Sequence, residues 1–216
     1  ALAFFTLCWV GYNYYSEYSR HANQSLLTVM NGYRALWMRE MIRRENRTMD
    51  AIMIGNLQRS IAFFANTSIF IVLGLVTMLG YQERSSDILQ HIPFAHPSTP
   101  FMWELKIFLL ILVFIYSFFK YTWSMRQYNY AGVFVNAVPP HHECLADADA
   151  ITARGARLIG NAARHFNNGV RAYYFGLAAL AWFINAYVFI AVTAWVVYVA
   201  HRREYHSATL SNLAQK

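Results

Sequence analysis

The chain has 216 residues, of which 57% are hydrophobic and 13% are charged, and its formal net charge is +7. Because a typical soluble domain has about 25% charged residues, this composition excludes an ordinary soluble protein. Membrane orientation alone produces a positive excess of this kind, so we do not expect nucleic acid as a partner.

Four runs with few or no charges divide the chain, and each predicts a membrane-spanning helix, which needs about 20 apolar residues. They lie at about residues 1–16, 60–82, 107–125 and 172–200. The first run is short, and since the chain does not begin with Met, we expect it to be the end of a longer span. The predicted fold class is all-α: a polytopic membrane protein with four transmembrane helices, forming a single membrane domain over residues 1–216.

The segment before the second span predicts an amphipathic helix at about residues 34–59. On a helical projection, charged and apolar side chains fall on opposite faces. The charged ones are Arg39, Glu40, Arg43, Arg47 and Asp50, and the apolar ones are Met38, Met41, Ile42, Met49, Ile52 and Met53. Spacings of four and three residues favour the pairs Glu40/Arg44 and Arg47/Asp50.

A second amphipathic helix is expected at about residues 143–167, after Pro139-Pro140, because proline does not continue a helix interior. Basic residues place both helices relative to the membrane. Residues 17–60 and 120–171 hold thirteen Lys and Arg residues, whereas residues 82–106 and 201–216 hold five. Since basic connections stay in the cytoplasm, we expect both amphipathic helices inside the cytoplasm and both chain termini outside it.

Acidic residues interleaved with the first basic stretch indicate specific pairing, because an anchor alone needs only positive charge. We predict that the two cytoplasmic helices dock through Glu45 and Asp50 against Arg164 and Arg171 of the second basic segment. Met49, Ile52 and Met53 would pack beneath. The predicted charge network comprises Arg43, Arg44, Glu45, Arg47, Asp50, Arg59, Arg164 and Arg171.

Polar residues within spans are costly and often functional. Asn66, Thr67 and Ser68 interrupt the second span, and Asn185 lies near the middle of the fourth. Such residues line a pore or form hydrogen bonds between helices. We favour the hydrogen bonds, because no ionisable residue lies at mid-membrane depth.

The string PPHHEC brings together four side chains that can bind metal: His141, His142, Glu143 and Cys144. They are weak metal candidates, because adjacent residues of a helix point about 100° apart and do not match a usual zinc spacing. A second weak alternative is an outer site between two pairs of histidines, His91 and His96 with His201 and His206. No histidine lies inside a predicted span, so we expect no haem and no other cofactor.

Three strings stand out: RENRTMDAIMIGNLQRSIAFFANTSIFIVLGL, FNNGVRAYYFGLAALAWFINAY and RREYHS. Over about residues 1–207 the chain resembles a bacterial inner-membrane family known as domain of unknown function 599. The resemblance implies a four-span protein of the bacterial inner (cytoplasmic) membrane, and it implies no activity or catalytic residue; with the orientation expected from the basic residues, both termini are periplasmic. The matching positions are Arg44, Glu45, Asn46, Arg47, Asp50, Asn56, Arg59, Asn66, Thr67, Phe166, Asn167, Gly169, Arg171, Tyr173 and Arg203.

No pattern of catalytic residues stands out, so we expect a non-enzymatic integral membrane protein: an accessory or scaffold subunit of a larger membrane complex, or a homo-oligomer. One alternative is a channel or transporter for a small solute or ion, with Arg47, Arg59 and Arg171 near its cytoplasmic mouth. The other is a membrane-embedded metal or lipid-handling enzyme. The expected partners are the lipid bilayer, further copies or other membrane subunits, and anionic lipid at the basic faces.

Overall fold

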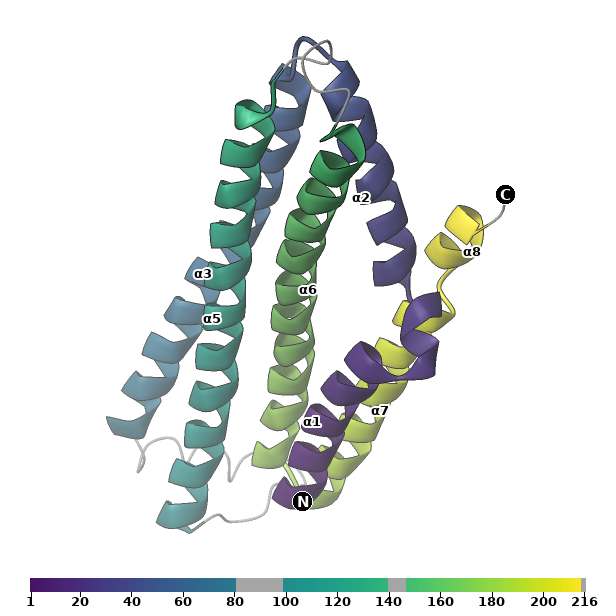
Figure 1. Ribbon diagram of the computed structural model, residues 1–216. Helices are drawn as coiled ribbons and strands as arrows, with labels where there is room; N and C mark the ends of the chain where they lie inside the picture. Colours follow the sequence, from purple (N-terminus) through teal and green to yellow (C-terminus); the bar gives the residue numbers. More distant parts are fainter. Residues whose placement is uncertain (81–98, 140–146, 215–216) are drawn as a thin grey trace.

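The structure, a computed structural model, describes residues 1–80, 99–139 and 147–214, and within these ranges every regular element is a helix (Figure 1). This confirms the predicted all-α fold class. Two of the described helices, α3 (Thr48–Gly80) and α5 (Pro100–Ala137), are long and apolar enough to cross a membrane.

Serine, threonine and asparagine begin three of the helices. The side chains of Ser25, Thr99 and Asn185 each accept a hydrogen bond from a backbone N–H group in the first turn that follows. In chain order the elements are α1 (Leu2–Tyr18), the 3-10 turn η1 (Arg20–Gln24), α2 (Leu26–Arg43), α3 (Thr48–Gly80), α5 (Pro100–Ala137), α6 (Ala148–Leu180), the 3-10 turn η4 (Ala181–Phe183), α7 (Ala186–Tyr205) and α8 (Ala208–Ala214).

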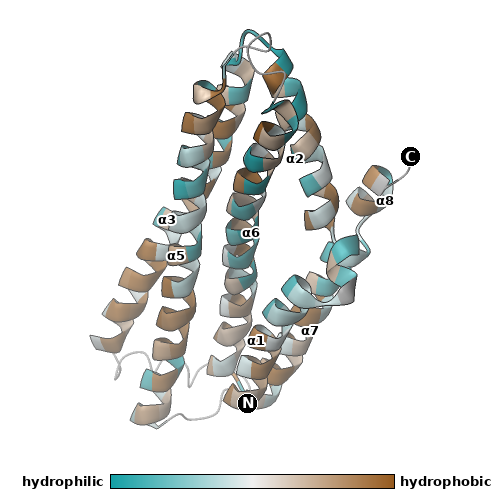
Figure 2. Cartoon of the chain, viewed as in Figure 1, coloured by the Kyte–Doolittle hydropathy of each residue, from teal (hydrophilic) through white to brown (hydrophobic). Residues whose placement is uncertain are grey.

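The long helices α3, α5 and α6 lie side by side, while α1 and α7 form a second pair that runs in one direction (Figure 1). The rings of Phe5 and Phe189 lie 5.2 Å apart near the start of both helices of that pair, and the Tyr12 hydroxyl donates to Glu204 further along. The two chain ends therefore lie at opposite ends of the α1–α7 pair. Figure 2 shows that the ends of α3 and α5 distant from the α2–α3 junction are the most apolar, whereas the junction itself is hydrophilic.

The interface between α5 and α6 is built from large side chains on α5 and small residues on α6. Gly155, Ala162, Gly169 and Gly176 recur on α6 every seven residues. A Cβ atom on Gly169 would lie 2.7 Å from the Tyr121 ring, and one on Gly176 would lie 3.0 Å from the Phe114 ring. Any larger residue at Gly169 would therefore push the two helices apart.

The prediction of one continuous amphipathic helix over residues 34–59 is wrong. α2 ends at Arg43 and α3 begins at Thr48, because the Asn46 side chain accepts a hydrogen bond from the Thr48 backbone N–H (2.9 Å) and starts a new helix. The break separates the predicted apolar face into two parts. Met38, Met41 and Ile42 are buried in the core, whereas Met49, Ile52 and Met53 are exposed by 71%, 48% and 49%.

The run at residues 172–200, predicted to be one span, is likewise two helices that meet at a turn. α6 continues to Leu180, and Asn185, in extended conformation, begins α7 in the opposite direction. Trp182, in the turn, stacks on Phe189 with ring centroids 5.2 Å apart. Because the residues of this turn are themselves apolar, hydropathy alone does not distinguish it from a straight crossing. The second amphipathic helix and the first part of this run belong to one helix, α6.

Candidate functional site

At the α2–α3 junction, one acidic side chain is the centre of a buried polar cluster. Asp50 is 1% exposed, and its Oδ1 atom accepts hydrogen bonds from Trp37 Nε1 (2.6 Å) and Arg44 Nη1 (2.8 Å). Its Oδ2 atom is buried without a hydrogen-bond partner among the described residues. Asp50 thus ties the start of α3 to α2, across the break at Asn46.

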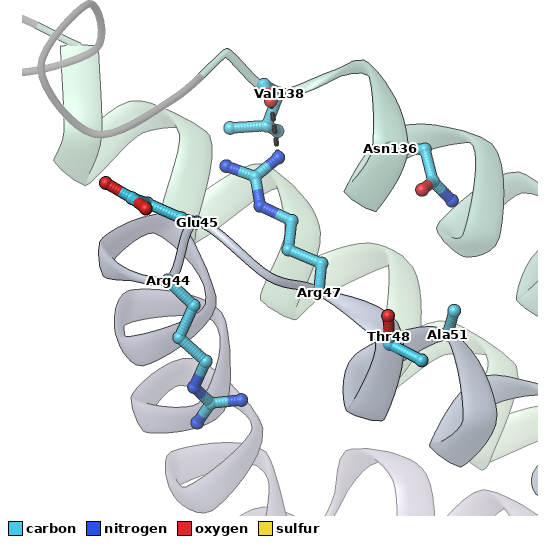
Figure 3. A pocket seen from close by; sticks show the side chains of 7 residues that line it. All are labelled: Arg44, Glu45, Arg47, Thr48, Ala51, Asn136 and Val138. Atoms are coloured by element: carbon cyan, nitrogen blue, oxygen red, sulfur yellow. Dashed lines mark hydrogen bonds between the residues drawn. The ribbon is translucent and has the colours of Figure 1, made fainter.

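Arg47, on the opposite side of the same junction, holds the end of α5 (Figure 3). Its guanidinium group donates to the backbone carbonyl oxygens of Val135, Val138 and Pro139, with distances of 2.9 Å to the first and last of these. Val135 lies in the last turn of α5, where backbone carbonyl groups have no partner within the helix. A cavity of about 690 Å³ lies beside it, lined by Arg44, Glu45, Arg47, Thr48, Ala51, Asn136 and Val138.

The predicted charge pairs differ from those in the structure. Glu40 pairs with Arg43 (2.9 Å) instead of Arg44, and Arg44 pairs with Asp50. The predicted docking of Glu45 and Asp50 against Arg164 and Arg171 is wrong. The helix break at Asn46 turns Asp50 back towards α2, and both Glu45 and Arg164 are exposed. Arg59 donates a hydrogen bond to Asn56 on its own helix. Arg171 forms its ion pair with a different carboxylate.

That carboxylate belongs to Glu204, on α7, and the pair forms a second buried cluster. Arg171 Nη2 lies 2.6 Å from Glu204 Oε1 and 2.9 Å from Oε2, and the two side chains are only 8% and 12% exposed. Tyr12 on α1 donates its hydroxyl to the same carboxylate (3.0 Å), and its ring lies under the Arg171 guanidinium. Asn168 accepts from Arg171 and donates to Glu17 (2.7 Å), so this cluster joins α1, α6 and α7.

A cavity of about 290 Å³ adjoins this cluster, between α2, α6 and α7. Three arginine side chains line it, together with one acidic, two other polar and five apolar residues. The lining residues are Arg34, Arg171, Arg203, Glu204, Asn167, Tyr174, Leu26, Leu27, Met30, Val170 and Ala200. No sequence pattern indicated this cavity, because its walls come from stretches far apart in the chain.

The polar residues predicted within spans do not converge on one place. The Ser68 hydroxyl is buried and interacts with the Phe64 carbonyl (2.9 Å) and the Tyr173 hydroxyl (3.0 Å), a hydrogen bond between helices of the kind expected. Thr67 donates to the Phe63 carbonyl on its own helix (2.8 Å), Asn66 is exposed, and Asn185 caps α7. Arg47, Arg59 and Arg171 likewise bind separate partners and form no common cluster.

The weak metal candidates His141, His142, Glu143 and Cys144, and the pair His91 and His96, lie outside the described residues. Within the described ranges, no group of three or more His, Cys, Asp or Glu side chains is arranged to hold a metal ion.

Residues 1–209 match the model of a family described as "Protein of unknown function, DUF599". The chain belongs to the DUF599 family. No curated protein and no solved structure matches the chain. In this DUF599 protein, Arg44, Glu45 and Arg47, three of the positions that carry the resemblance, line the cavity at the helix junction, and Asn167, Arg171 and Arg203 line the three-arginine cavity.

Proposed function

We propose that this DUF599 protein is a non-enzymatic scaffold of the bacterial cytoplasmic membrane that self-associates through the outer face of α3. Asn66 is the observation that carries this proposal. It lies on the exposed side of an apolar helix, between Phe63 and Phe70, which are 66% and 71% exposed. Its side-chain amide forms no hydrogen bond with any other described residue.

A membrane placement that agrees with the helix arrangement has five crossing segments. These are α1, the apolar ends of α3 and α5, and the hairpin formed by the end of α6 with α7. Apart from Lys106 and Arg171, the Lys and Arg residues of the described ranges then lie at or beyond the cytoplasmic boundary, as expected of basic residues. In this placement the start of α1 is periplasmic, as predicted, and the C-terminus is cytoplasmic, because α7 crosses in the same direction as α1.

In a bilayer, an unpaired amide on the lipid-facing surface is unfavourable. Transfer of such a group from water to a hydrocarbon costs about 4–8 kcal/mol. Asn66 carries both a donor and an acceptor, so two copies of the chain related by a twofold axis can satisfy each other. Hydrogen bonds of this kind between membrane helices contribute about 0.6–2 kcal/mol each.

The exposed residues around Asn66 follow the spacing of a helix–helix contact. Along the whole of α3 there is a set of exposed residues that are spaced alternately by three and four positions. We call this set the α3 seam: Met49, Ile52, Asn56, Arg59, Phe63, Asn66, Phe70, Leu73 and Thr77. This is the a/d pattern of a coiled coil, in which a polar asparagine at one of these positions specifies register.

The seam extends beyond the membrane, which indicates what covers it. Met49 and Ile52 precede the uncharged run at residues 60–82, so lipid does not cover them. A second copy in the same membrane presents an identical α3 in parallel orientation, and so matches the seam in both its cytoplasmic and its membrane parts.

Cysteine cross-linking tests this proposal. Asn66→Cys, in a chain whose Cys8 and Cys144 are replaced by serine, should form a disulfide-linked dimer in native membranes after mild oxidation. Phe119→Cys is the matched control, because Phe119 is 64% exposed on α5. The Gln58–Asn129 hydrogen bond sets the register of the two helices and places residues 66 and 119 at similar depth. Equal cross-linking of the two variants, or none from either, would contradict an α3 interface.

A further inference from the structure

The three-arginine cavity carries more positive charge than its own acidic group balances. Arg171 and Glu204 neutralise each other through their ion pair (2.6 Å). Arg34 and Arg203 remain, so the walls carry a net charge of about +2 around a space of about 290 Å³. Arg203 is held in place by the Tyr174 ring beneath it and by the Tyr174 hydroxyl, to which it donates (2.6 Å).

Of these two arginines, Arg34 is the more unusual, because it is partly buried without an acidic partner among the described residues. Its Nη1 atom donates to Asn31 on the same helix (2.8 Å), and within the described ranges no carboxylate forms an ion pair with it. Burial lowers the pKa of the Arg34 guanidinium, an effect that Tyr128 partly opposes. A guanidinium group remains protonated even so. A partly buried cation without a counter-charge is costly, and an anion in the cavity would remove that cost.

The remaining walls favour an amphiphile over a simple salt ion. Leu26, Leu27 and Met30 from α2 face Val170 and Ala200 across the same space. In the membrane placement proposed above, on which this step rests, the cavity lies at the cytoplasmic boundary, where lipid headgroups lie. Its volume suits a headgroup and not a whole lipid, so the acyl chains would stay in the bilayer.

We propose that this cavity binds a terminal phosphate group, supplied either by the headgroup of phosphatidic acid or by inorganic phosphate. Such a group carries a charge of about −1.5 to −2 at pH 7, which matches the excess in the walls. The Arg34 and Arg203 guanidinium groups can bind its oxygens by paired hydrogen bonds, and the apolar walls accommodate the glycerol part of a lipid.

Thermal unfolding of the purified chain in a neutral detergent tests the proposal, because a ligand that binds only the folded state raises the melting temperature. The probes are dihexanoyl phosphatidic acid, dihexanoyl phosphatidylcholine and sodium phosphate. Phosphatidic acid should raise the melting temperature at concentrations where phosphatidylcholine does not. An equal effect of sodium phosphate would identify free phosphate as the source. A melting temperature that neither phosphatidic acid nor phosphate raises would overturn the proposal.

Two matched pairs of variants locate the site. Arg34→Gln and Arg203→Gln should each raise the half-saturating concentration of phosphatidic acid about tenfold or more, since each removes a charged hydrogen-bond donor. Arg39→Gln and Arg202→Gln each remove one charge from the same helices outside the cavity. Each should change the half-saturating concentration of phosphatidic acid less than about twofold. An equal loss in all four variants would show diffuse attraction and would overturn the site. Because Arg203 is exposed, Arg203→Gln should fold normally and keeps the test decisive even if Arg34→Gln unfolds.

Discussion

The α5–α6 interface and the α3 seam use the same helical spacing in opposite ways. On α6, small residues seven apart receive the Tyr121 and Phe114 rings of α5, and the contact is complete within one chain. On α3, the seam presents Phe63, Phe70 and Leu73 outwards, and nothing in the described part of the chain covers them. The first pattern holds the fold together, whereas the second remains available for assembly.

Loss of the Arg171 side chain should have the largest effect, because it belongs wholly to the interior. Arg171→Ala leaves Glu204 buried without its partner, and removing one member of such a pair costs about 3–5 kcal/mol. Chemical denaturation in detergent would measure this, with Arg164→Ala, an exposed change on the same helix, as control. Stability losses of similar size in both variants would show that the Arg171–Glu204 pair has no special role.

Two glycine-to-alanine variants compare the interior face of α6 with the exposed face of α3. Gly169→Ala places a Cβ atom 2.7 Å from the Tyr121 ring and should cost about 1–3 kcal/mol through overpacking. Gly74→Ala, on α3, meets nothing within 4 Å and should be neutral or stabilising by up to about 1 kcal/mol, because alanine favours helix. A Gly169→Ala protein as stable as Gly74→Ala would mean that α5 and α6 lie further apart than in this structure.

The helix junction should show an intermediate effect. Asp50→Ala removes the acceptor of Trp37 and Arg44 and should cost about 1–3 kcal/mol, the typical penalty for an unsatisfied buried group. Glu45→Ala, at an exposed position in the same junction, should stay within about 0.5 kcal/mol of the wild type. If the two variants melt alike, the buried Asp50 cluster does not stabilise the junction, and the charges there only anchor the start of α3 at the membrane.

Changes in the seam should have the smallest effect on the fold of one chain. Ile52→Ser should leave the unfolding of the detergent-dispersed monomer within about 0.5 kcal/mol of the wild type, since Ile52 is exposed by 48%. The same change should weaken association measured by analytical ultracentrifugation. A clear loss of monomer stability would show that Ile52 packs within its own chain.

Two asparagines explain most of what the sequence could not predict about the fold. Asn46 and Asn185 each accept a hydrogen bond from a backbone N–H group and begin a helix. Periodicity continued smoothly across Asn46, and hydropathy continued across Asn185, so both patterns predicted helices that were too long. A polar side chain able to bind its own backbone is a cap signal in its own right, and that signal was present at both positions.

Glu45 and Asp50 stand out together as acidic residues among arginines, yet only Asp50 is buried. The all-α class could be predicted, because long apolar runs are a local feature. The partners of Asp50 and Arg171 could not. Arg171 meets Glu204 only because the chain turns back at η4, and Arg44 meets Asp50 only because α2 ends at Arg43. The three-arginine cavity depends on both of these changes of direction, and so no single stretch of sequence indicated it.

Native mass spectrometry of the protein released from lipid nanodiscs tests the central claim most directly. One chain has a mass of 25.0 kDa. Assembly through the α3 seam predicts a complex of two chains for the wild type and a shift to single chains for Asn66→Leu, with Phe119→Leu unchanged. A wild-type protein that remains a single chain, or an Asn66→Leu protein that assembles as well as the wild type, would contradict it.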